Sequence, residues 1–307
     1  MARGFAAVLS PADLTVIVNV GDDDTIYGVH VSADVDTMVY TLAGIESEHG
    51  WGIRGDTFAL MEHLGALGVD ATFRLGDRDF AHCLFRTLHL RSGGTLGEAT
   101  ALLASSLGVE AAVVPASDDP VRTKVRIEDG SWLDFQDYFV GRRHEPRVTG
   151  LRYEGAAEAR PVARAIEAIE AADLVVIAPS NPPLSIHPIL AIPGYREALA
   201  SKELVVAVSP LVGGAAVKGP AAEVMAAMDY PADSRGVAAA YSGLISDLVV
   251  MTGDGRDVAG VSVHERDTMI GTRLSSSRLA AQILDIAGNR ASRTVPTPPP
   301  EESAAAP

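Results

Sequence analysis

The sequence predicts an α/β fold, a Rossmann-like doubly wound and mainly parallel sheet with a helical and hairpin insertion. Short apolar runs such as 174–178 (LVVIA) and 204–208 (LVVAV) alternate with loops and segments of helical period. Such continuous apolar runs are typical of parallel strands that are covered on both faces. The 307 residues, 47% of them hydrophobic, suffice for one large domain of this class.

In the first third of the chain, one expected strand is followed by a series of helices. The strand, 14–18 (LTVIV), ends abruptly in polar and acidic residues. Helices are then expected over MVYTLAG, TFALMEHLGALG and FAHCLFRTLHLR, and a further one ends near 107. Their expected N-terminal caps are Asp34, Asp56, Asp77 or Asp79, and the Thr95–Glu98 capping box.

The middle of the chain favours antiparallel strands before the α/β alternation resumes. AAVVP is strand-like, and VRTKVRIEDGSWLDF predicts two strands joined at Asp129 and Gly130. We expect 55–153 to be an insertion or cap on a single domain spanning 1–290. The remaining residues, 291–307, are rich in Pro, Ala, Ser and Glu and are expected to be a disordered tail. Later strands are expected at 174–178, 204–208 and 248–251, and later helices at 161–171, up to 201, 221–228, 234–244 and near the C-terminus.

The charge and cysteine content exclude several classes of function. A net charge of -15 argues against a nucleic-acid partner, because binding to phosphates requires a positive surface. The only cysteine, Cys83, cannot form an internal disulfide, and the N-terminus lacks a signal peptide, so we expect a cytoplasmic protein. The uncharged window 174–195 is long enough to span a membrane, but its five prolines exclude a spanning helix.

Carboxylates cluster where the first strand ends and where the following helix begins. Crowded carboxylates repel each other unless a cation lies among them, and Mg²⁺ is typically held by one or two carboxylates together with substrate phosphates. The alternative is a solvated turn at 22–24 and a simple helix cap at Asp34. The residues concerned are Asn19, Asp22, Asp23, Asp24, Asp34 and Asp36.

Two later loops follow expected strands and have residues suited to anions. Ligands of open α/β sheets bind beyond the carboxyl ends of the strands, so these loops and the acidic loop converge if their strands are parallel neighbours. The loop SPLVGGAAVKGP fits neither a Walker A nor a GxGxxG pattern, and both loops are also compatible with ordinary turns. The candidate residues are Ser180, Asn181, Ser209, Gly213, Gly214 and Lys218.

Four ordered stretches carry a resemblance to a known family. VNVGDDDTIYGVHVSADVDTMVYTLAG, LGDRDFAHCLFRT, APSNPPLSIHPILAIPG and VAVSPLVGGAAVKGPA closely resemble the 2-phospho-L-lactate transferase family of coenzyme F420 biosynthesis, whose mycobacterial members act as phosphoenolpyruvate transferases. The resemblance implies a Rossmann-like, commonly dimeric enzyme. It also implies transfer of a phospholactyl or phosphoenolpyruvyl group from a guanosine diphosphate adduct to the deazaflavin Fo, with release of GMP.

The resemblance also implies roles for individual residues. Asp22, Asp23 and Asp36 would be catalytic and hold Mg²⁺, with Asn19 and Asp34 beside them. Asp77, Arg78 and Asp79 would border the Fo pocket, whereas Ser180, Asn181, Ser209, Gly213, Gly214 and Lys218 would bind the guanylyl part. The family's first strand and GGxGGA-type loop are not found before Ala2, and we expect a start codon assigned too late. The alternatives are another nucleotidyl or sugar-nucleotide transferase, and a truncated homologue that binds guanine nucleotide or deazaflavin without turnover.

Overall fold

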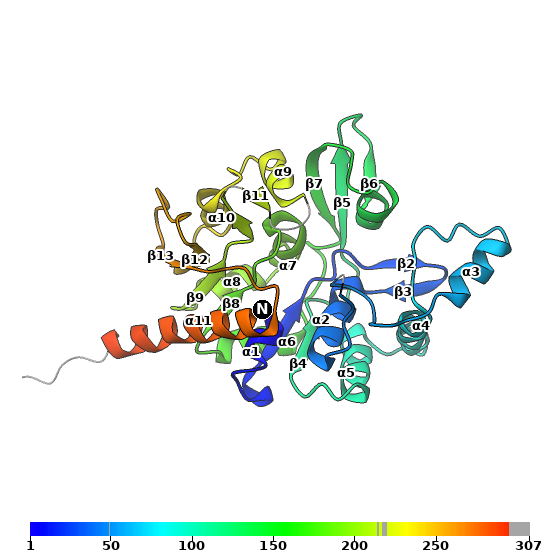
Figure 1. Ribbon diagram of the computed structural model, residues 1–307, viewed down its shortest axis with the longest axis horizontal. Coiled ribbons are helices and arrows are strands. Elements are labelled where there is room, and N and C mark those ends of the chain that lie inside the picture. Colours follow the sequence, from blue (N-terminus) through cyan, green and yellow to red (C-terminus); the bar gives the residue numbers. More distant parts are fainter. Residues whose placement is uncertain (49, 214, 217–219, 295–307) are drawn as a thin grey trace, which may run out of the picture.

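Two parallel sheets form the centre of the molecule in the computed structural model, which describes residues 1–48, 50–213, 215–216 and 220–294. Strands β1 (Thr15–Val18) and β4 (Ala112–Pro115) pair in one sheet. The other has the order β13-β12-β9-β8 and consists of β8 (Val175–Ile177), β9 (Val205–Val208), β12 (Asp247–Met251) and β13 (Ser262–Arg266). The predicted α/β class with a mainly parallel sheet is confirmed (Figure 1).

The two sheets share one hydrophobic core. Val18 of β1 and Ile177 of β8 belong to the same cluster of buried side chains. Strand β1 bonds to β4 along one edge, and no strand of the described residues pairs with its other edge. The sheets are therefore joined through side chains rather than through a continuous hydrogen-bonded ladder.

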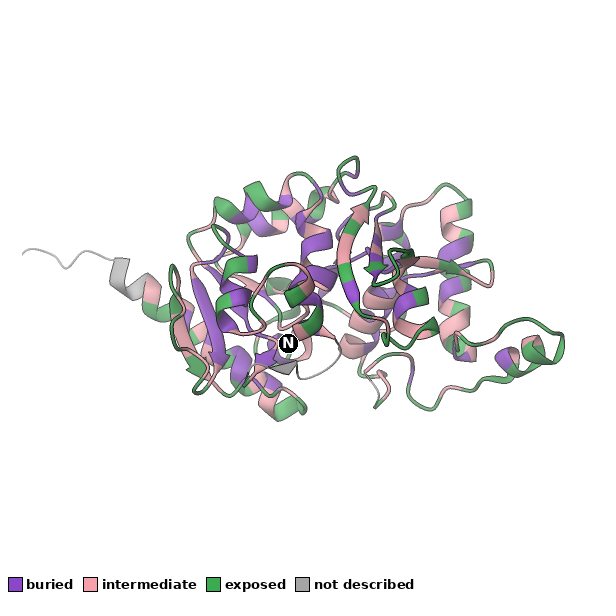
Figure 2. Ribbon diagram, turned by 90° about the horizontal axis from the view of Figure 1, so that it is seen from above, coloured by how far each residue is buried: buried purple, intermediate pink, exposed green. Residues whose placement is uncertain are grey.

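Side chains alternate between the two faces of the β8–β13 sheet, and both faces are covered. On one face, Val206 and Val208 pack with helices α1 (Ala2–Phe5) and α11 (Arg273–Thr294). On the other face, Val205 and Ala207 belong to the larger core. Figure 2 shows the buried residues concentrated in the sheets and on the inward sides of the surrounding helices. Coverage on both faces explains why these strands are so apolar.

The remaining elements surround this centre. Helices α2 (Ala33–Ala43), α5 (Leu96–Ser106) and α6 (Ala163–Ala171) pack against β1 and β4. The others are η1 (Pro11–Asp13), α3 (Ala59–Ala66), α4 (Asp77–Arg91), η2 (Asp137–Gly141), η3 (Pro182–Ile186), α7 (His187–Leu190), α8 (Tyr195–Ala200), β10 (Leu211–Val212), β11 (Ala215–Ala216), α9 (Ala221–Ala227) and α10 (Ser234–Ala240).

The segment expected to be an insertion is divided between the core and a separate sheet. Strand β4 lies within 55–153 but pairs with β1. The expected hairpin is present as β5 (Arg122–Ile127) and β6 (Trp132–Asp134), and β7 (Val148–Glu154) extends it to a three-stranded antiparallel sheet at the top of Figure 1. We refer to β5, β6, η2 and β7 as the antiparallel cap.

Several expected boundaries differ from the structure. Helix α2 follows Ser32, and Asp34 lies in its first turn rather than capping it. A two-stranded ribbon, β2 (Asp24–Ile26) and β3 (Val29–Val31), occupies residues for which no strand was expected. Helix α11 continues to Thr294, beyond the expected end of the domain at 290, and 295–307 lie outside the described residues.

The helix caps at Asp56 and Asp77 are exchanged relative to the prediction. Asp77 accepts hydrogen bonds from the backbone amides of Ala59 and Leu60, at 3.1 and 3.0 Å, and so caps α3. Asp56 accepts from the amides of Arg78 and Asp79, both at 3.1 Å, and so caps α4. Each carboxylate thus serves the helix that is distant from it in sequence, which local patterns cannot reveal. None of the helices in the described ranges has the length and apolar character needed to cross a membrane.

Candidate active site

The loop after β1 is anchored to the start of α2 by Asn19. The Asn19 side chain is buried, and its Nδ2 donates a 3.0 Å hydrogen bond to Oδ2 of Asp34. Its Oδ1 accepts a 2.8 Å hydrogen bond from the backbone amide of Gly21. A single amide side chain therefore fixes the turn of the loop and the position of Asp34 at the same time.

Asp22, which is buried, and Asp34, which is half-buried, form a pair of acidic side chains. Burial raises the pKa of Asp22 well above its usual range, and the nearby Asp34 raises it further. Burial also raises the pKa of Asp34 to about 6, although the hydrogen bond from Asn19 opposes this. Asp22 Oδ1 is buried and has no hydrogen-bond partner among the described residues. A buried carboxylate oxygen without a partner is costly unless a cation or donor reaches it.

Asp23 is held differently, although it is the next residue. Its Oδ1 accepts a 2.7 Å hydrogen bond from the Ser32 hydroxyl, and its Oδ2 lies 3.0 Å from Nε2 of His30. His30 lies on β3, where its backbone amide donates to the Thr87 hydroxyl at 2.7 Å. Asp23 is therefore fixed between the β2–β3 ribbon and the start of α2, and both of its oxygens have partners.

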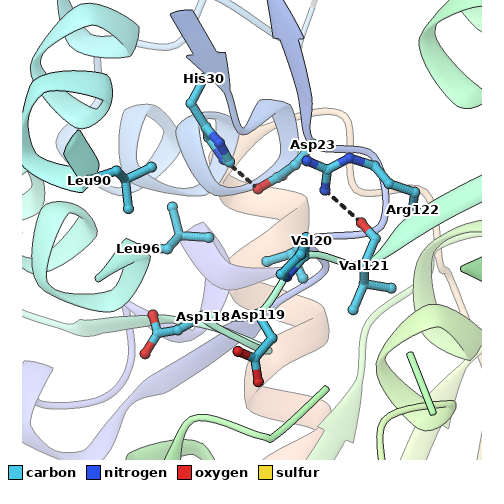
Figure 3. Close-up of a pocket in the computed structure, with 10 residues that line it drawn as sticks. Val20, Asp23, His30, Leu90, Leu96, Asp118, Asp119, Val121 and Arg122 are labelled. Carbon is cyan, nitrogen blue, oxygen red and sulfur yellow. Dashed lines mark hydrogen bonds and ion pairs between the residues drawn. The ribbon is translucent and has the colours of Figure 1, made fainter. Parts of the chain in front are cut away.

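A pocket of about 220 Å³ opens beside Asp23 at the carboxyl ends of β1 and β4 (Figure 3). Asp23 and His30 form part of its wall, and Asp118 and Asp119, which follow β4, form another. The sequence suggests a turn for the latter two residues, with a smaller chance that they face the crevice, and in the structure they line the pocket and also have structural partners. Asp118 Oδ1 accepts from the amide of Gly97 at 2.7 Å, and Asp119 Oδ2 accepts from that of Arg160 at 2.9 Å. The apolar part of the lining consists of Val20, Leu90, Leu96, Pro120 and Val121.

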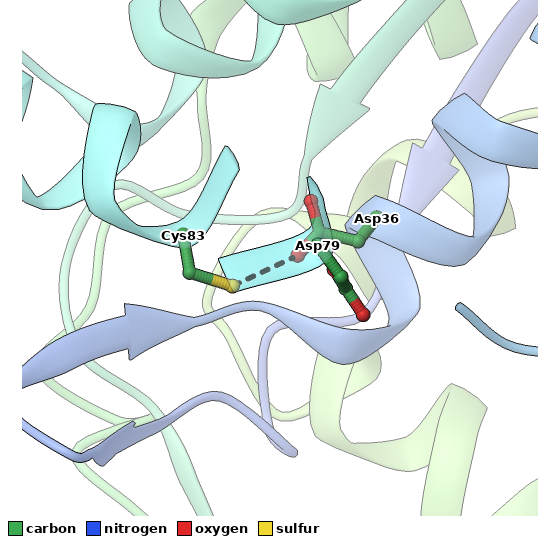
Figure 4. Close-up of side chains that lie close together, drawn as sticks. All are labelled: Asp36, Asp79 and Cys83. Carbon is green, nitrogen blue, oxygen red and sulfur yellow. Dashed lines mark hydrogen bonds between the residues drawn. The ribbon is translucent and has the colours of Figure 1, made fainter. Parts of the chain in front are cut away.

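Asp36 lies in a buried cluster with a cationic partner that the sequence did not suggest. Arg86 of α4, which is 1% exposed, donates from Nη2 to Oδ1 of Asp36 and from Nη1 to the carbonyl of His30 at 3.0 Å. Cys83 and Asp79 lie beside Asp36, as Figure 4 shows. Burial raises the pKa of Asp36, and Arg86 opposes this shift. Asp36 is thus neutralised by a guanidinium, which leaves it less suited than Asp22 or Asp34 to hold a metal ion.

The motif LGDRD contributes mainly to structure. Asp77 caps α3, and the exposed side chain of Arg78 forms an ion pair with the buried carboxylate of Asp56 at 3.4 Å. Asp79 points toward the buried cluster, where its Oδ1 accepts a 2.8 Å hydrogen bond from the Tyr40 hydroxyl. Burial raises the pKa of Asp79 to about 6, and the neighbouring Asp36 adds to this. Of these three residues, only Asp79 lies near the acidic side chains of the candidate site, beside Asp36.

In the loops after β8 and β9, several of the predicted site residues form hydrogen bonds with neighbouring parts of the protein. Asn181 accepts from the amide of Leu184 at 3.3 Å and caps η3, while Ser180 is half-buried after β8. Ser209 follows β9 and is buried, with its hydroxyl 3.2 Å from the amide of Leu211 that donates to it. The amide of Gly213 donates to Asp254 at 2.7 Å. Gly214 and Lys218 lie outside the described residues.

The structure therefore brings together some of the predicted residues and separates others. Asn19, Asp22, Asp23 and Asp34 surround the end of β1, and Asp36 and Asp79 lie nearby around Arg86. The sequence analysis missed His30, Arg86 and Thr123. A signal for Arg86 existed, because Asp79, Cys83 and Arg86 recur at helical spacing on one face of α4.

These features define a class of protein before any comparison is made. A carboxylate pair with a buried, unsatisfied oxygen, beside an acid-lined pocket at the carboxyl ends of parallel strands, is typical of enzymes that bind a divalent cation with a phosphorylated substrate. The oxygen donors fit a hard cation such as Mg²⁺, and the nearby Asp36 is already paired with Arg86.

Comparisons with known proteins identify the family. A model of the family "2-phospho-L-lactate transferase CofD" matches residues 1–269, and this chain belongs to that family. It is 38% identical over 296 residues to the 2-phospho-L-lactate transferase of Methanocaldococcus jannaschii, with 94% of each chain covered. It is 42% identical to that of Methanopyrus kandleri, with 90% of each covered, and 39% identical to a phosphoenolpyruvate transferase of Streptomyces griseus, with 93% of each covered.

Solved structures support the fold independently. A crystal structure of a member of the UPF0052 family from Bacillus halodurans superimposes with a TM-score of 0.59 at 17% identity, over 92% of this chain and 94% of the other. At this level of identity the likeness concerns the fold alone. The chain is thus a transferase of the CofD type on an α/β fold.

Proposed function

We propose that this protein transfers a phospholactyl or phosphoenolpyruvyl group from a guanosine diphosphate adduct to a hydroxyl of the deazaflavin Fo. The products are GMP and the precursor, or dehydro precursor, of coenzyme F420. The observation that carries the proposal is the Asp22–Asp34 pair, with its buried and unpartnered Asp22 oxygen, in a chain of the 2-phospho-L-lactate transferase family.

Asp22 and Asp34 are the residues best suited to hold Mg²⁺. When bound, this ion would offset negative charge on the phosphate oxygens of the donor. Asn19 would keep Asp34 in place, because its amide is bonded both to that carboxylate and to the loop. Of the expected metal ligands, Asp23 is already bonded to Ser32 and His30, and Asp36 to Arg86. We therefore assign Asp36 a positioning role.

Asp23 is the best candidate to receive a proton from the acceptor. It lines the pocket, and its carboxylate is held by Ser32 and His30 in a fixed orientation. A carboxylate fixed at the edge of a pocket can accept the proton of an attacking hydroxyl, while the oxygen of that hydroxyl bonds to phosphorus and the GMP oxygen leaves.

The contacts proposed for the substrates stay as the sequence suggests them. The guanylyl part would contact Ser180, Asn181, Ser209, Gly213, Gly214 and Lys218, and Fo would contact Asp77, Arg78 and Asp79.

The proposal is tested with the purified full chain, Fo, the guanylyl adduct and Mg²⁺. Mass spectrometry is expected to detect the F420 precursor and GMP in equal amounts. Asp22→Asn is expected to lower the rate by at least about 100-fold, whereas Asp24→Asn, a change of the same kind in the same loop, is expected to keep it. Turnover by Asp22→Asn at the wild-type rate would refute the assigned role of Asp22.

The two alternatives give different results in the same experiment. A protein that only binds would retain Fo or guanine nucleotide in equilibrium dialysis and release no GMP. A nucleotidyl or sugar-nucleotide transferase would consume a nucleotide sugar and leave Fo unchanged. Offering lactyl, enolpyruvyl and glyceryl donors in parallel identifies the transferred group.

We also propose that the protein is a cytoplasmic homodimer, as members of the family commonly are. One chain has a mass of 32.1 kDa. Light scattering coupled to size-exclusion chromatography is therefore expected to give about twice this mass. A mass of one chain across the micromolar range would contradict the dimer.

A further inference from the structure

Thr123, which has no role in the site described above, lies against the loop after β1 that carries Asp22. It is the second residue of β5, at the start of the antiparallel cap, and is 1% exposed. Its backbone amide donates a 2.7 Å hydrogen bond to the carbonyl of Gly21. Its hydroxyl, however, has no hydrogen-bond partner among the described residues. The cap thus delivers a buried hydroxyl to the loop that carries Asp22.

The space around Gly21 shows how close this approach is. A Cβ atom on Gly21 would lie 2.6 Å from Thr123 Oγ1 and 3.0 Å from Asn19 Oδ1. Only glycine therefore allows the Thr123 hydroxyl to lie this near to the loop. A second bond fixes the same contact, because the buried Gln136 of the cap donates from Nε2 to the carbonyl of Asp22 at 2.9 Å.

Two buried oxygens without partners therefore lie on facing segments. Asp22 Oδ1 and Thr123 Oγ1 are both buried, and neither makes a hydrogen bond of normal length and angle with a described atom. The Thr123 hydroxyl nevertheless lies close enough to Asp22 to oppose the rise that burial causes in the pKa of that carboxyl. Each such group costs about 1–3 kcal/mol if nothing satisfies it. A hard cation satisfies carboxylate and hydroxyl oxygens together, and a Ser or Thr hydroxyl is a regular ligand of Mg²⁺ in phosphoryl-transfer enzymes.

We propose that the hydroxyl of Thr123 is a third protein oxygen of the Asp22–Asp34 cation site. This inference rests on the cation site of the proposed function and extends it to the antiparallel cap. Asp22 and Asp34 of the core and Thr123 of the cap would then hold the cation together, so that its binding would strengthen the contact between the cap and the loop after β1.

The test uses Mn²⁺ alone as the probe, with the full-length protein and no nucleotide. Free Mn²⁺ is measured by electron paramagnetic resonance for the wild type, Thr123→Val, Thr123→Ser and Thr100→Val. Valine has the shape of threonine without its hydroxyl, and serine keeps the hydroxyl. Thr100 is the matched control, since it lies on α5 and is also fully buried with an unpartnered hydroxyl.

We expect Thr123→Val to weaken Mn²⁺ binding by about 10-fold or more. Thr123→Ser and Thr100→Val should bind like the wild type. In the presence of a chelator, Thr123→Val should unfold at a temperature no lower than the wild type, because the hydroxyl that it removes makes no hydrogen bond. A purely structural threonine would give the reverse pattern, with lower thermal stability and unchanged affinity.

The outcomes separate this inference from the proposed function. Equal Mn²⁺ affinity of the wild type and Thr123→Val would overturn the role of Thr123 and leave the Asp22–Asp34 site intact. Absence of Mn²⁺ binding by the wild type would overturn both. Weak binding by Thr123→Ser as well as by Thr123→Val would also overturn the inference, since the retained hydroxyl would then not be the group that matters.

Discussion

The carboxyl groups of the buried Asp22 and the half-buried Asp34 repel each other, so the acidic pair should lower stability whenever no cation is bound. Proteins commonly retain such costly groups because function requires them. We predict that Asp34→Asn raises the free energy of unfolding in a chelator by about 1–2 kcal/mol, a few degrees in Tm for a chain of this size. The asparagine can keep the hydrogen bond from Asn19, since its carbonyl oxygen still accepts.

Addition of Mg²⁺ should reverse the order of stability of these two proteins. The wild type is expected to gain stability with increasing Mg²⁺, whereas Asp34→Asn should gain little. Differential scanning calorimetry at pH 7.5 with EDTA and with Mg²⁺ measures both effects. Asp24→Asn is the control in the same loop, because among the described residues the Asp24 carboxylate is hydrogen-bonded only to the adjacent amide of Thr25, at 2.7 Å. An Asp34→Asn protein that is less stable than the wild type in EDTA would argue against repulsion within the pair.

His187 makes stability depend on pH at a position away from the acidic residues. Burial lowers the pKa of His187, and the hydrogen bond to the Ala240 carbonyl at 3.2 Å only partly opposes this. The charged group near it is Arg196, which also lowers the pKa, and the rings of Tyr230 and Tyr241 pack against it. Below about pH 6.5 the unfolded chain therefore binds a proton that the folded chain does not.

We accordingly predict that stability falls as the pH is lowered from about 6.5 to 5, and that His187→Gln reduces this dependence. Above about pH 7 the imidazole is neutral in both states, and the slope contributed by His187 should vanish. Urea unfolding at half-unit pH intervals measures the slope. His63→Gln, on the exposed surface of α3, should behave like the wild type. Identical slopes for the wild type and His187→Gln would contradict the prediction.

At the level of elements, the Arg86–Asp36 ion pair joins α4 to the first turn of α2. Removing one partner of a buried ion pair leaves an uncompensated charge and typically lowers the free energy of unfolding by about 3–5 kcal/mol. Replacing both partners by apolar residues can leave it nearly unchanged. We predict such a loss for Arg86→Met and recovery of at least half of it in the double variant Arg86→Met/Asp36→Leu. Urea unfolding of the two single variants and the double variant gives the coupling energy. Additive losses would show that the pair does not act as a unit.

Local signals predicted most elements, and contacts between distant segments account for the rest. The Thr95–Glu98 capping box and the turn at Asp129 and Gly130 depend on residues adjacent in sequence, and both are present. The exchanged caps at Asp56 and Asp77 depend on how α3 and α4 meet, which no local pattern specifies. The same holds for the site. The sequence identifies Asp22, Asp23, Asp34 and Asp36 as a group of acidic residues. Only the structure separates them, because His30 bonds to Asp23 and Arg86 bonds to Asp36.

At the scale of the whole molecule, three segments distant in sequence meet at Gly21. A Cβ on this residue would lie 2.6 Å from Thr123 Oγ1 in the antiparallel cap and 2.9 Å from Pro188 Cβ in α7, and 3.0 Å from Asn19 Oδ1 in its own loop. Strand β1 is hydrogen-bonded to β4 and to no strand of the β8–β13 sheet in the described part of the chain. The contact at Gly21 is therefore one of the places where the β1 loop touches both the cap and the helix that follows β8.

Gly21→Ala tests whether this contact couples the three segments. The added methyl group cannot be accommodated without moving the cap or α7, since two of the distances lie below those of real Cβ contacts. Overpacking of this kind costs about 1–3 kcal/mol, and we expect a matching loss of stability together with weaker Mn²⁺ binding. Gly65→Ala is the matched control, because it lies within α3 with no atom within 4 Å of the new Cβ, and it should raise stability by about 0.4–1 kcal/mol. Gly21→Ala with wild-type stability and affinity would mean that the loop, the cap and α7 can separate at no cost, which would remove the physical basis for a cation site shared between the loop and the cap.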